Sequence, residues 1–173
     1  MQASDLAKFI RDVPDFPKKG IIFKDITPLL QNAPALRKTL SILAGQYKGK
    51  KIDYVVAMES RGFIFGAALA AKLGAGFVPV RKPGKLPYKI KRATYQLEYG
   101  TDTLEIHQDA LPKNSRVLIV DDLLATGGTA QAVLKLVRTF QADVVGIAFV
   151  IELVFLNGRK KLKNAPIFSI LKY

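Results

Sequence analysis

The sequence predicts a single α/β domain built on a twisted, mostly parallel sheet with helices on both faces. The chain has 173 residues, which is enough for one hydrophobic core and short for two. The order strand, helix, strand occurs twice, over 52–80 and again over 117–151. The strand expected at 117–120 has no polar residue, which is typical of a strand covered on both faces.

The individual elements are predicted from runs and spacings of apolar residues. Apolar side chains recur at helical spacing over 34–47 and 129–140, whereas the expected strands are short apolar runs. Residues 165–173 are short and apolar, which indicates one more strand. The expected helices are 3–11, 34–47, 63–73 and 129–140, and the other expected strands are 52–58, 77–80, 117–120 and 144–151.

Residues 81–101 interrupt this alternation. They are polar and contain Pro83, Gly84, Pro87 and Gly100, which favour turns. We expect a long loop or a flexible hairpin, in which 94–99 returns as a strand toward 103–106. Because loops of this length are usually functional, the expected role is a lid over a binding site.

The composition excludes several kinds of site. The chain has no cysteine, so it has no disulfide, thiolate metal site or cysteine nucleophile. Its single histidine, His107, excludes a site with several histidines, and a structural or surface role is expected for it. The apolar stretch 62–80 is interrupted by Lys72, Gly74 and Gly76, which favours a buried helix and strand over a membrane span. No signal peptide is recognised, and a soluble cytoplasmic protein is expected.

The formal net charge of +13 favours partners that carry several negative charges. Such partners include nucleic acids and small substrates with several phosphate groups. Many of the basic residues are expected only to solvate the surface, among them those at 18–19, 48–51 and 159–163. The charge alone does not choose among these readings.

The loop after the strand 117–120 has a composition suited to phosphate. It reads DDLLATGGT over 121–129, and a helix follows. The four residues from Thr126 to Thr129 fall at the start of that helix, where free N–H groups and the helix dipole attract anions and glycine allows close approach. A lysine at the position required by a Walker A motif is absent, which disfavours a nucleoside triphosphate loop.

Asp121 and Asp122 open the same loop. Carboxylates repel phosphate, but they suit the hydroxyls of a sugar diol, either directly or through a divalent metal and its waters. A phosphate-binding loop next to two such acids describes a site for ribose 5-phosphate. The alternative is a helix cap with two surface acids, although adjacent aspartates at the end of an apolar strand are poor structural choices.

Two more loops are expected at the same edge, because ligands of open parallel sheets bind beyond the carboxyl ends of the strands. The loop after Met58 reads ESRG over 59–62 and enters a helix, and the loop after Val80 reads RKPGK over 81–85. Each alone is compatible with an ordinary cap or a solvated turn. Together they bring three or four cations to the ribose 5-phosphate site. Phosphoribosyl pyrophosphate (PRPP) has a matching layout of monophosphate, diol and diphosphate.

The segment VLIVDDLLATGGT over 117–129 resembles the PRPP-binding signature of type I phosphoribosyltransferases, in its adenine-specific form. The resemblance extends over nearly the whole chain. The other segments that resemble adenine phosphoribosyltransferases are Phe16-Pro17, 20–26, 59–63, 81–87 and 97–100. It implies one domain over 1–173, with a small hood at about 12–30 and a lid at about 81–101.

The resemblance also implies a role for each segment. Asp121 and Asp122 would face the ribose hydroxyls, and the lid would carry Glu98 and Tyr99 toward the reacting bond. The hood would cover the base, with Phe23 stacking on adenine, backbone groups near Ile22 and Lys24 reading its edge, and Leu123 close by. The 5-phosphate would be held by Ala125, Thr126, Gly127, Gly128 and Thr129, and the pyrophosphate by Glu59, Ser60, Arg61, Arg81 and Lys85.

The reaction implied is displacement of pyrophosphate from the anomeric carbon by an adenine nitrogen. Arg61, Arg81, Lys85 and Mg²⁺ would stabilise the departing charge, with Mg²⁺ held mainly by the substrate. Glu98 is the expected proton-transfer group, its alternative being a surface carboxylate. A cis peptide before Ser60 and a homodimer are also implied.

Ala125 bears on the identity of the base. In the 6-oxopurine enzymes of this superfamily an aspartate commonly stands at the matching position, and its absence disfavours hypoxanthine and guanine. Two alternatives stay open at this point. One is a phosphoribosyltransferase for another base, such as xanthine or a pyrimidine. The other is a regulatory protein of the same fold that binds nucleic acid, which only the charge supports; a nucleic-acid partner is therefore not expected.

Overall fold

The structure, a computed structural model, describes residues 2–96 and 101–173. Its centre is a five-stranded sheet in the order β4-β3-β7-β8-β9, in which every neighbouring pair is parallel. The α/β fold with a parallel sheet between helices is therefore confirmed. The strands are β3 (Tyr54–Met58), β4 (Gly76–Val80), β7 (Arg116–Leu124), β8 (Asp143–Glu152) and β9 (Ile167–Lys172).

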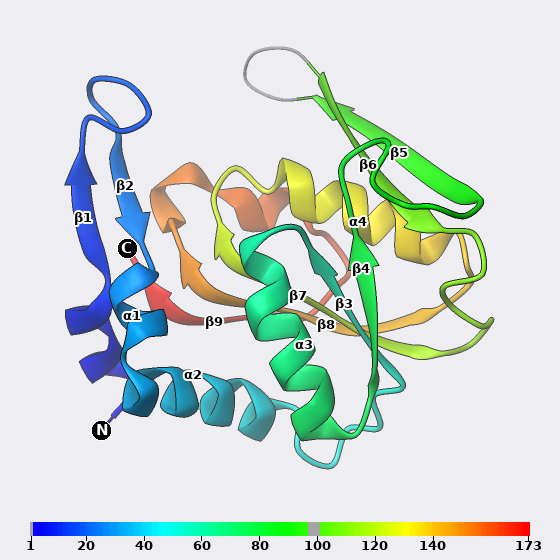
Figure 1. The fold of residues 1–173 in the computed structure, drawn as a ribbon, viewed down its shortest axis with the longest axis horizontal. Coiled ribbons are helices and arrows are strands. Elements are labelled where there is room, and N and C mark those ends of the chain that lie inside the picture. Colours follow the sequence, from blue (N-terminus) through cyan, green and yellow to red (C-terminus); the bar gives the residue numbers. More distant parts are fainter. Residues whose placement is uncertain (1, 97–100) are drawn as a thin grey trace.

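Helices cover both faces of this sheet (Figure 1). One face packs against α2 (Ala33–Gln46) and α3 (Arg61–Leu73), together with the short α1 (Thr27–Gln31) and the 3-10 helix η1 (Ser4–Phe9). The other packs against α4 (Gly128–Arg138). Two further 3-10 turns, η2 (Val154–Leu156) and η3 (Gly158–Lys161), connect β8 to β9.

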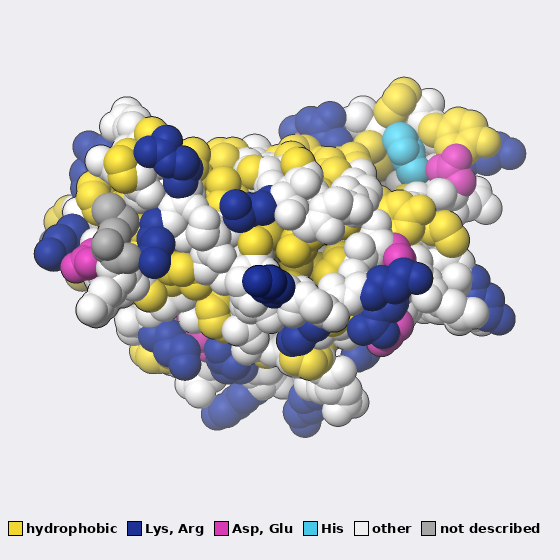
Figure 2. Space-filling model, turned by 90° about the horizontal axis from the view of Figure 1, so that it is seen from below, with side chains coloured by type: hydrophobic (Ala, Val, Ile, Leu, Met, Phe, Trp, Pro, Cys, Tyr) yellow, Lys and Arg dark blue, Asp and Glu magenta, His cyan; other side chains and the backbone are white. Residues whose placement is uncertain are grey.

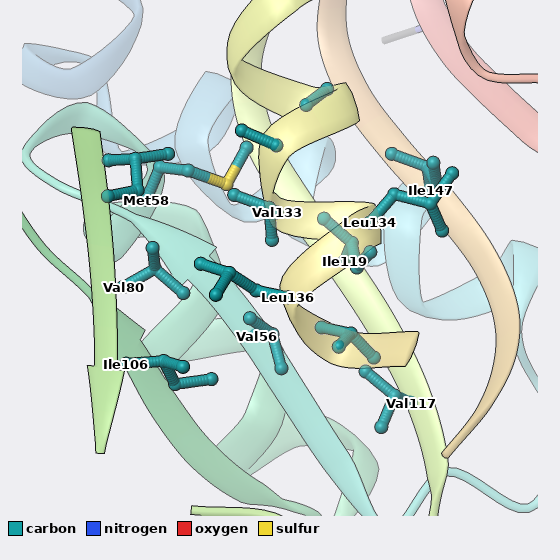
Figure 3. Close-up of a cluster of buried hydrophobic side chains, with 14 of the residues drawn as sticks. Val56, Met58, Val80, Ile106, Val117, Ile119, Val133, Leu134, Leu136 and Ile147 are labelled. Carbon is teal, nitrogen blue, oxygen red and sulfur yellow. The ribbon is translucent and has the colours of Figure 1, made fainter. Parts of the chain in front are cut away.

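Each face has its own hydrophobic core, because side chains alternate along a strand. In β3, Val55 and Ala57 belong to the core beneath α2 and α3, whereas Val56 and Met58 belong to the core beneath α4. Figure 3 shows this second core, in which side chains of α4 such as Leu136 meet those of the strands. The two cores fix the sheet between helices and leave its carboxyl edge free for a site.

Two antiparallel hairpins stand apart from the main sheet. β1 (Arg11–Pro14) pairs with β2 (Ile22–Asp25), and β5 (Ile90–Gln96) pairs with β6 (Thr101–His107). Both rise on the side of the molecule toward which β4 points (Figure 1). The first overlaps the segment expected as a hood at about 12–30, and the second overlaps the segment expected as a lid at about 81–101.

Three elements differ most from their expected bounds. The helix expected over 3–11 is a 3-10 helix that ends at Phe9, because Arg11–Pro14 pairs with β2 instead. The strand expected to begin at residue 94 begins at Ile90, as β5, since its pairing with β6 extends to His107. The strand expected at 117–120 continues to Leu124, because its backbone stays paired with β8 as far as Glu152. The strand expected within 165–173 is confirmed as β9.

The charged surface is dispersed on the face that Figure 2 shows. Lys and Arg side chains are spread over it with apolar and neutral areas between them, rather than gathered into one patch. This distribution agrees with the expectation that many basic residues only solvate the surface. In residues 2–96 and 101–173, no helix is long and apolar enough to cross a bilayer.

α3 lies close to the sheet because it carries Gly66. A Cβ atom placed on Gly66 would lie 2.5 Å from the Cβ of Ala57 and 3.1 Å from Cε2 of Phe77. Such a separation is far inside ordinary carbon–carbon contact, so only a hydrogen fits at this position. The close approach holds the first turn of α3, with Arg61, at the end of β3.

Gly66→Ala is expected to lower the free energy of unfolding by about 1–3 kcal/mol, since an added methyl group in a filled interior forces backbone shifts. Gly45→Ala is the matched control, because nothing lies within 4 Å of a Cβ on Gly45, which lies within α2. It should raise stability by up to about 1 kcal/mol through helix propensity. Urea unfolding followed by circular dichroism measures both. Equal stabilities would contradict the close packing.

Candidate active site

A cavity of about 560 Å³ opens at the carboxyl edge of the sheet, large enough for a small substrate. It lies where β3 and β7 end, at the start of α3 and α4, and beside the β5–β6 hairpin. Its lining joins three segments that the sequence singled out separately. The lining residues are Met58, Glu59, Ser60, Arg61, Lys82, Tyr95, Asp102, Leu104, Asp121, Asp122, Leu123, Leu124, Ala125, Thr126, Gly127, Gly128, Thr129 and Ala130.

The loop between β7 and α4 forms one wall. Gly127 is the N-cap of α4 and has φ +79°, a left-handed conformation that glycine adopts without strain. Among the described side chains, none caps this helix. Its first amides and the positive end of its dipole therefore face the cavity, which is the arrangement that binds a phosphate group.

The two aspartates lie at the end of β7 beside this loop. The Asp121 carboxylate is partly buried, and its Oδ1 accepts a hydrogen bond of 2.9 Å from the Asp122 amide. The Asp122 side chain is only 6 % exposed, and its Oδ2 lies 2.7 Å from Nε of Arg61. This contact is an ion pair without hydrogen-bond alignment, so Oδ2 has no donor among the described residues. A buried carboxylate oxygen that still lacks a donor suits a ligand hydroxyl or a hydrated cation.

Burial raises the pKa of both acids. For Asp121, desolvation has the largest effect on the pKa, and the neighbouring charge of Asp122 raises it further. For Asp122, desolvation again raises the pKa, while the Arg61 guanidinium acts in the opposite direction. Two carboxylates so close together interact as a pair, which is a common property of functional sites.

The turn between β3 and α3 forms a second wall. The peptide between Glu59 and Ser60 is cis, as the resemblance implied. Ser60 is the N-cap of α3 but makes no side-chain capping bond. Arg61 points across the cavity edge, with its guanidinium 5.2 Å from the ring centroid of Phe23 in the N-terminal hairpin. This contact joins the hairpin to the site.

Glu59 contacts the basic residues that follow β4. Its buried carboxylate lies 2.8 Å from Nε of Arg81 and 3.1 Å from Nζ of Lys85, and it accepts a 2.8 Å bond from the Lys82 amide. Burial tends to raise the Glu59 pKa, but these donors together hold it below its ordinary value. Arg81 and Lys85 are thus turned to Glu59 and do not line the cavity, whereas the Lys82 side chain does.

Two polar residues of the lining, Tyr95 and Asp102, were not singled out in the sequence, and Lys82 was named only as part of the loop 81–85. Lys82 Nζ lies 2.9 Å from Oδ2 of Asp102, and the Tyr95 hydroxyl donates to the same oxygen at 3.3 Å. That hydroxyl also lies 3.4 Å from Oγ1 of Thr129, which links the β5–β6 hairpin to α4. The register that pairs Tyr95 with Asp102 is the signal that could have identified this group.

The other expected site residues fall into three groups. Leu123 lines the cavity. Ile22, Phe23 and Lys24 lie on β2 outside the lining, with Ile22 exposed and Lys24 Nζ 2.6 Å from Oδ1 of Asp12. Glu98 and Tyr99 lie outside the described residues.

The described residues contain no group of three or more His, Asp or Glu side chains that could hold a metal ion. A cation in this cavity would therefore depend on oxygens of the bound substrate, and the protein carboxylates in the lining are those of Glu59, Asp102, Asp121 and Asp122. The donor set is compatible with Mg²⁺, which binds through few carboxylates and keeps several waters or phosphate oxygens.

Comparison with known proteins agrees with this geometry. The phosphoribosyl transferase domain matches residues 25–172 of this chain. The adenine phosphoribosyltransferase of Acaryochloris marina is 59% identical over 169 residues, which cover 98% of this chain and 99% of that protein.

Solved structures give the same result. The adenine phosphoribosyltransferase of Thermoanaerobacter pseudethanolicus superposes with a TM-score of 0.97 at 54% identity, over 99% of this chain and 100% of that one. The enzyme of Saccharomyces cerevisiae, complexed with adenine and an imino-altritol bisphosphate, has a TM-score of 0.92 at 46% identity, over 97% of each chain. From the cavity, the fold and these relatives together, the chain belongs to the phosphoribosyltransferase family and, within it, to the adenine phosphoribosyltransferases.

Proposed function

We propose that this protein transfers the 5-phosphoribosyl group of PRPP to adenine, forming AMP and pyrophosphate in purine salvage. The observation that carries this proposal is the meeting of an uncapped helix start, the buried Asp122 and the partly buried Asp121 in one cavity. Relatives named for this activity match nearly the whole chain. The yeast relative has been crystallised with adenine and a bisphosphate.

The sugar phosphate would bind against β7 and α4. The amides of 126–129 and the hydroxyls of Thr126 and Thr129 would hold the 5-phosphate, with Ala125 leaving room beside them. Asp121 and Asp122 would accept hydrogen bonds from the ribose hydroxyls. This assignment follows the order of these residues along the chain, from the end of β7 to the start of α4.

The pyrophosphate would lie toward Ser60 and Arg61. Lys82 lines this part of the cavity, and we add it to the expected set. Arg81 and Lys85 would contribute through their positive field, or directly after leaving Glu59. Mg²⁺, when bound, would neutralise part of the leaving-group charge. The protein cations would stabilise the charge that develops as the bond to pyrophosphate breaks.

The base would bind beneath the N-terminal hairpin, between Phe23 and Leu123. Ile22 and Lys24 would present backbone groups to the adenine edge. The β5–β6 hairpin would close the site and exclude water, bringing Glu98 and Tyr99 to the reaction centre. A homodimer and a cytoplasmic location stay predictions; light scattering on the purified protein tests the first.

Pyrophosphate release from PRPP tests the proposed activity. Adenine is expected to give a kcat/KM at least about a hundredfold above those of hypoxanthine, guanine, xanthine and uracil, since buried polar groups left unpaired penalise the wrong base. Chelation of Mg²⁺ is expected to abolish the reaction. A higher kcat/KM with another base would overturn the assignment to adenine.

Glu98→Gln is expected to lower kcat by about 10²–10⁴-fold, because it removes a proton-transfer group and leaves the substrate contacts. The KM values for both substrates should change much less. Asp109→Asn, which neutralises an exposed carboxylate beyond β6, is the control and should behave as wild type. An unchanged kcat in Glu98→Gln would return Glu98 to a surface role.

Asp121→Asn is expected to weaken PRPP use and to raise Tm at neutral pH. A carboxyl group whose folded-state pKa is raised binds more protons folded than unfolded, so stability falls as pH rises from the unfolded pKa, about 4, through the raised one. Asparagine keeps the hydrogen bond from the Asp122 amide without that loss. The Tm gain should be absent near about pH 4 and grow with pH. Scanning calorimetry at several pH values measures it, and a pH-independent difference would contradict the argument.

A further inference from the structure

The back of the phosphate-binding loop is packed against a second glycine. A Cβ atom on Gly127 would lie 2.5 Å from the carbonyl oxygen of Gly158 and 3.2 Å from its Cα. In return, a Cβ on Gly158 would overlap the carbonyl oxygen of Ala125 and lie 3.1 Å from the Gly127 amide nitrogen. The two backbones therefore touch without any side chain between them. Gly158 is the surface on which the loop rests.

The residue after Gly158 is held by a buried acid. The Arg159 guanidinium makes two parallel hydrogen bonds to the Glu152 carboxylate, one from Nε and one from Nη2 at 2.7 Å. Its Nη1 also donates to the Ile167 carbonyl oxygen at 3.3 Å. The Glu152 side chain is only 4 % exposed. Arg159 was expected to be a solvated surface charge, and the structure corrects this.

This pair connects the loop to the sheet. Glu152 is the last residue of β8 and pairs with Leu124, the last residue of β7 before the loop. The Leu153 amide donates to the Leu124 carbonyl oxygen at 2.9 Å. On the other side, Nε2 of Gln131 in α4 donates to the Lys161 carbonyl oxygen at 3.2 Å. The turn 158–161 is thus fixed to both elements that the loop joins.

Arg159 does not reach the ligand itself. It is not part of the cavity lining, and three of its donors face Glu152 and Ile167. Only the acid of this pair is buried, since the Arg159 side chain is 40 % exposed, and such a pair contributes little net stability because water screens it and desolvation of the acid offsets the attraction. The pair is better explained by the geometry that it fixes around Arg159. Two parallel hydrogen bonds hold a guanidinium in direction as well as in place.

We propose that Arg159, oriented by Glu152, is a positioning residue for PRPP. It holds Gly158 in contact with residues 125–127 and thereby fixes the amides that bind the 5-phosphate. This inference rests on the proposed function, because it assigns that loop to the sugar phosphate. It predicts that loosening the pair weakens binding of the phosphate end of the substrate and leaves the base site and the chemical step largely intact.

The test compares Arg159→Lys and Glu152→Gln with Lys160→Gln. Lysine keeps the charge of Arg159 but cannot make the paired bonds, and glutamine keeps the shape of Glu152 without its charge. Lys160 is exposed in the same turn, so its substitution controls for a lost positive charge. Calorimetric titration with ribose 5-phosphate gives the Kd without turnover. Steady-state assays give kcat and the KM for PRPP and for adenine separately.

Arg159→Lys and Glu152→Gln are expected to raise the Kd for ribose 5-phosphate and the KM for PRPP about tenfold, with kcat and the adenine KM within about twofold of wild type. Lys160→Gln should match wild type throughout. Ribose 5-phosphate bound equally well by all three variants would overturn the proposal. So would an equal rise in the KM for both substrates, which indicates general loosening.

Gly158→Ala tests the same proposal if the Arg159→Lys and Glu152→Gln variants do not fold. It inserts a methyl group between Gly158 and the Ala125 carbonyl and should weaken ribose 5-phosphate binding in the same way. Unchanged binding in Gly158→Ala would overturn the proposal. If the wild-type protein binds ribose 5-phosphate but does not use adenine, only the proposed function is contradicted. The Kd values of the variants would still test the positioning role of Arg159.

Discussion

The parallel pairing of β7 with β8 is the constraint on which the rest of the site depends. The pairing does not stop where the apolar run ends at Val120, but continues until Leu124 lies beside Glu152. Asp121 and Asp122 are therefore held in an extended backbone at the edge of the sheet. Only residues 125–127 remain to turn the chain into α4. The distance between the acids and the helix amides is fixed by the backbone, not by side-chain packing.

Much of the fold could be predicted from the sequence, because the central strands and long helices follow simple apolar patterns. β3, β4, β8 and α3 lie within a few residues of their expected bounds. The N-terminal hairpin was missed as a hairpin, since β1 is largely exposed and has no apolar run. Its strands are stabilised by their mutual pairing and by the Arg11–Asp25 and Lys24–Asp12 ion pairs, none of which a local pattern shows.

The candidate site was predictable where its residues follow a strand directly. Asp121, Asp122, Ser60 and Arg61 were found for this reason, and all of them line the cavity. The Lys82–Asp102 pair in the same lining could not be found in this way. Lys82 meets Asp102 from 20 residues away, and this contact depends on the β5–β6 register.

The packing role of Gly158 could not be predicted from the local sequence either. Its role depends on contact with Ala125 and Gly127, about thirty positions earlier in the chain. The basic run around Arg159 resembles a solvated surface, because the sequence gives no sign that Glu152 at the end of β8 lies beside it. Long-range contacts between backbones and between single charges are the part of the site that local sequence patterns do not encode.

Three neighbouring strands end in a buried acid that holds an arginine. Glu59 follows β3 and pairs with Arg81, Asp122 lies near the end of β7 and pairs with Arg61, and Glu152 ends β8 and pairs with Arg159. The three acid side chains are 4–7 % exposed. The three arginine side chains are 35–41 % exposed, and pairs between a buried acid and a partly exposed base contribute little to stability, so a stabilising role does not explain why three of them lie side by side.

The position that the three acid–arginine pairs share does explain their presence. At this edge the protein must keep several cations in place before an anionic substrate arrives, although the cations repel one another. A buried carboxylate beside each guanidinium offsets that repulsion, so the cations stay at this edge before the substrate binds. Two of these arginines adjoin the cavity or its rim, and the third supports the phosphate loop from behind. The same device thus orders both the binding groups and the backbone on which they depend.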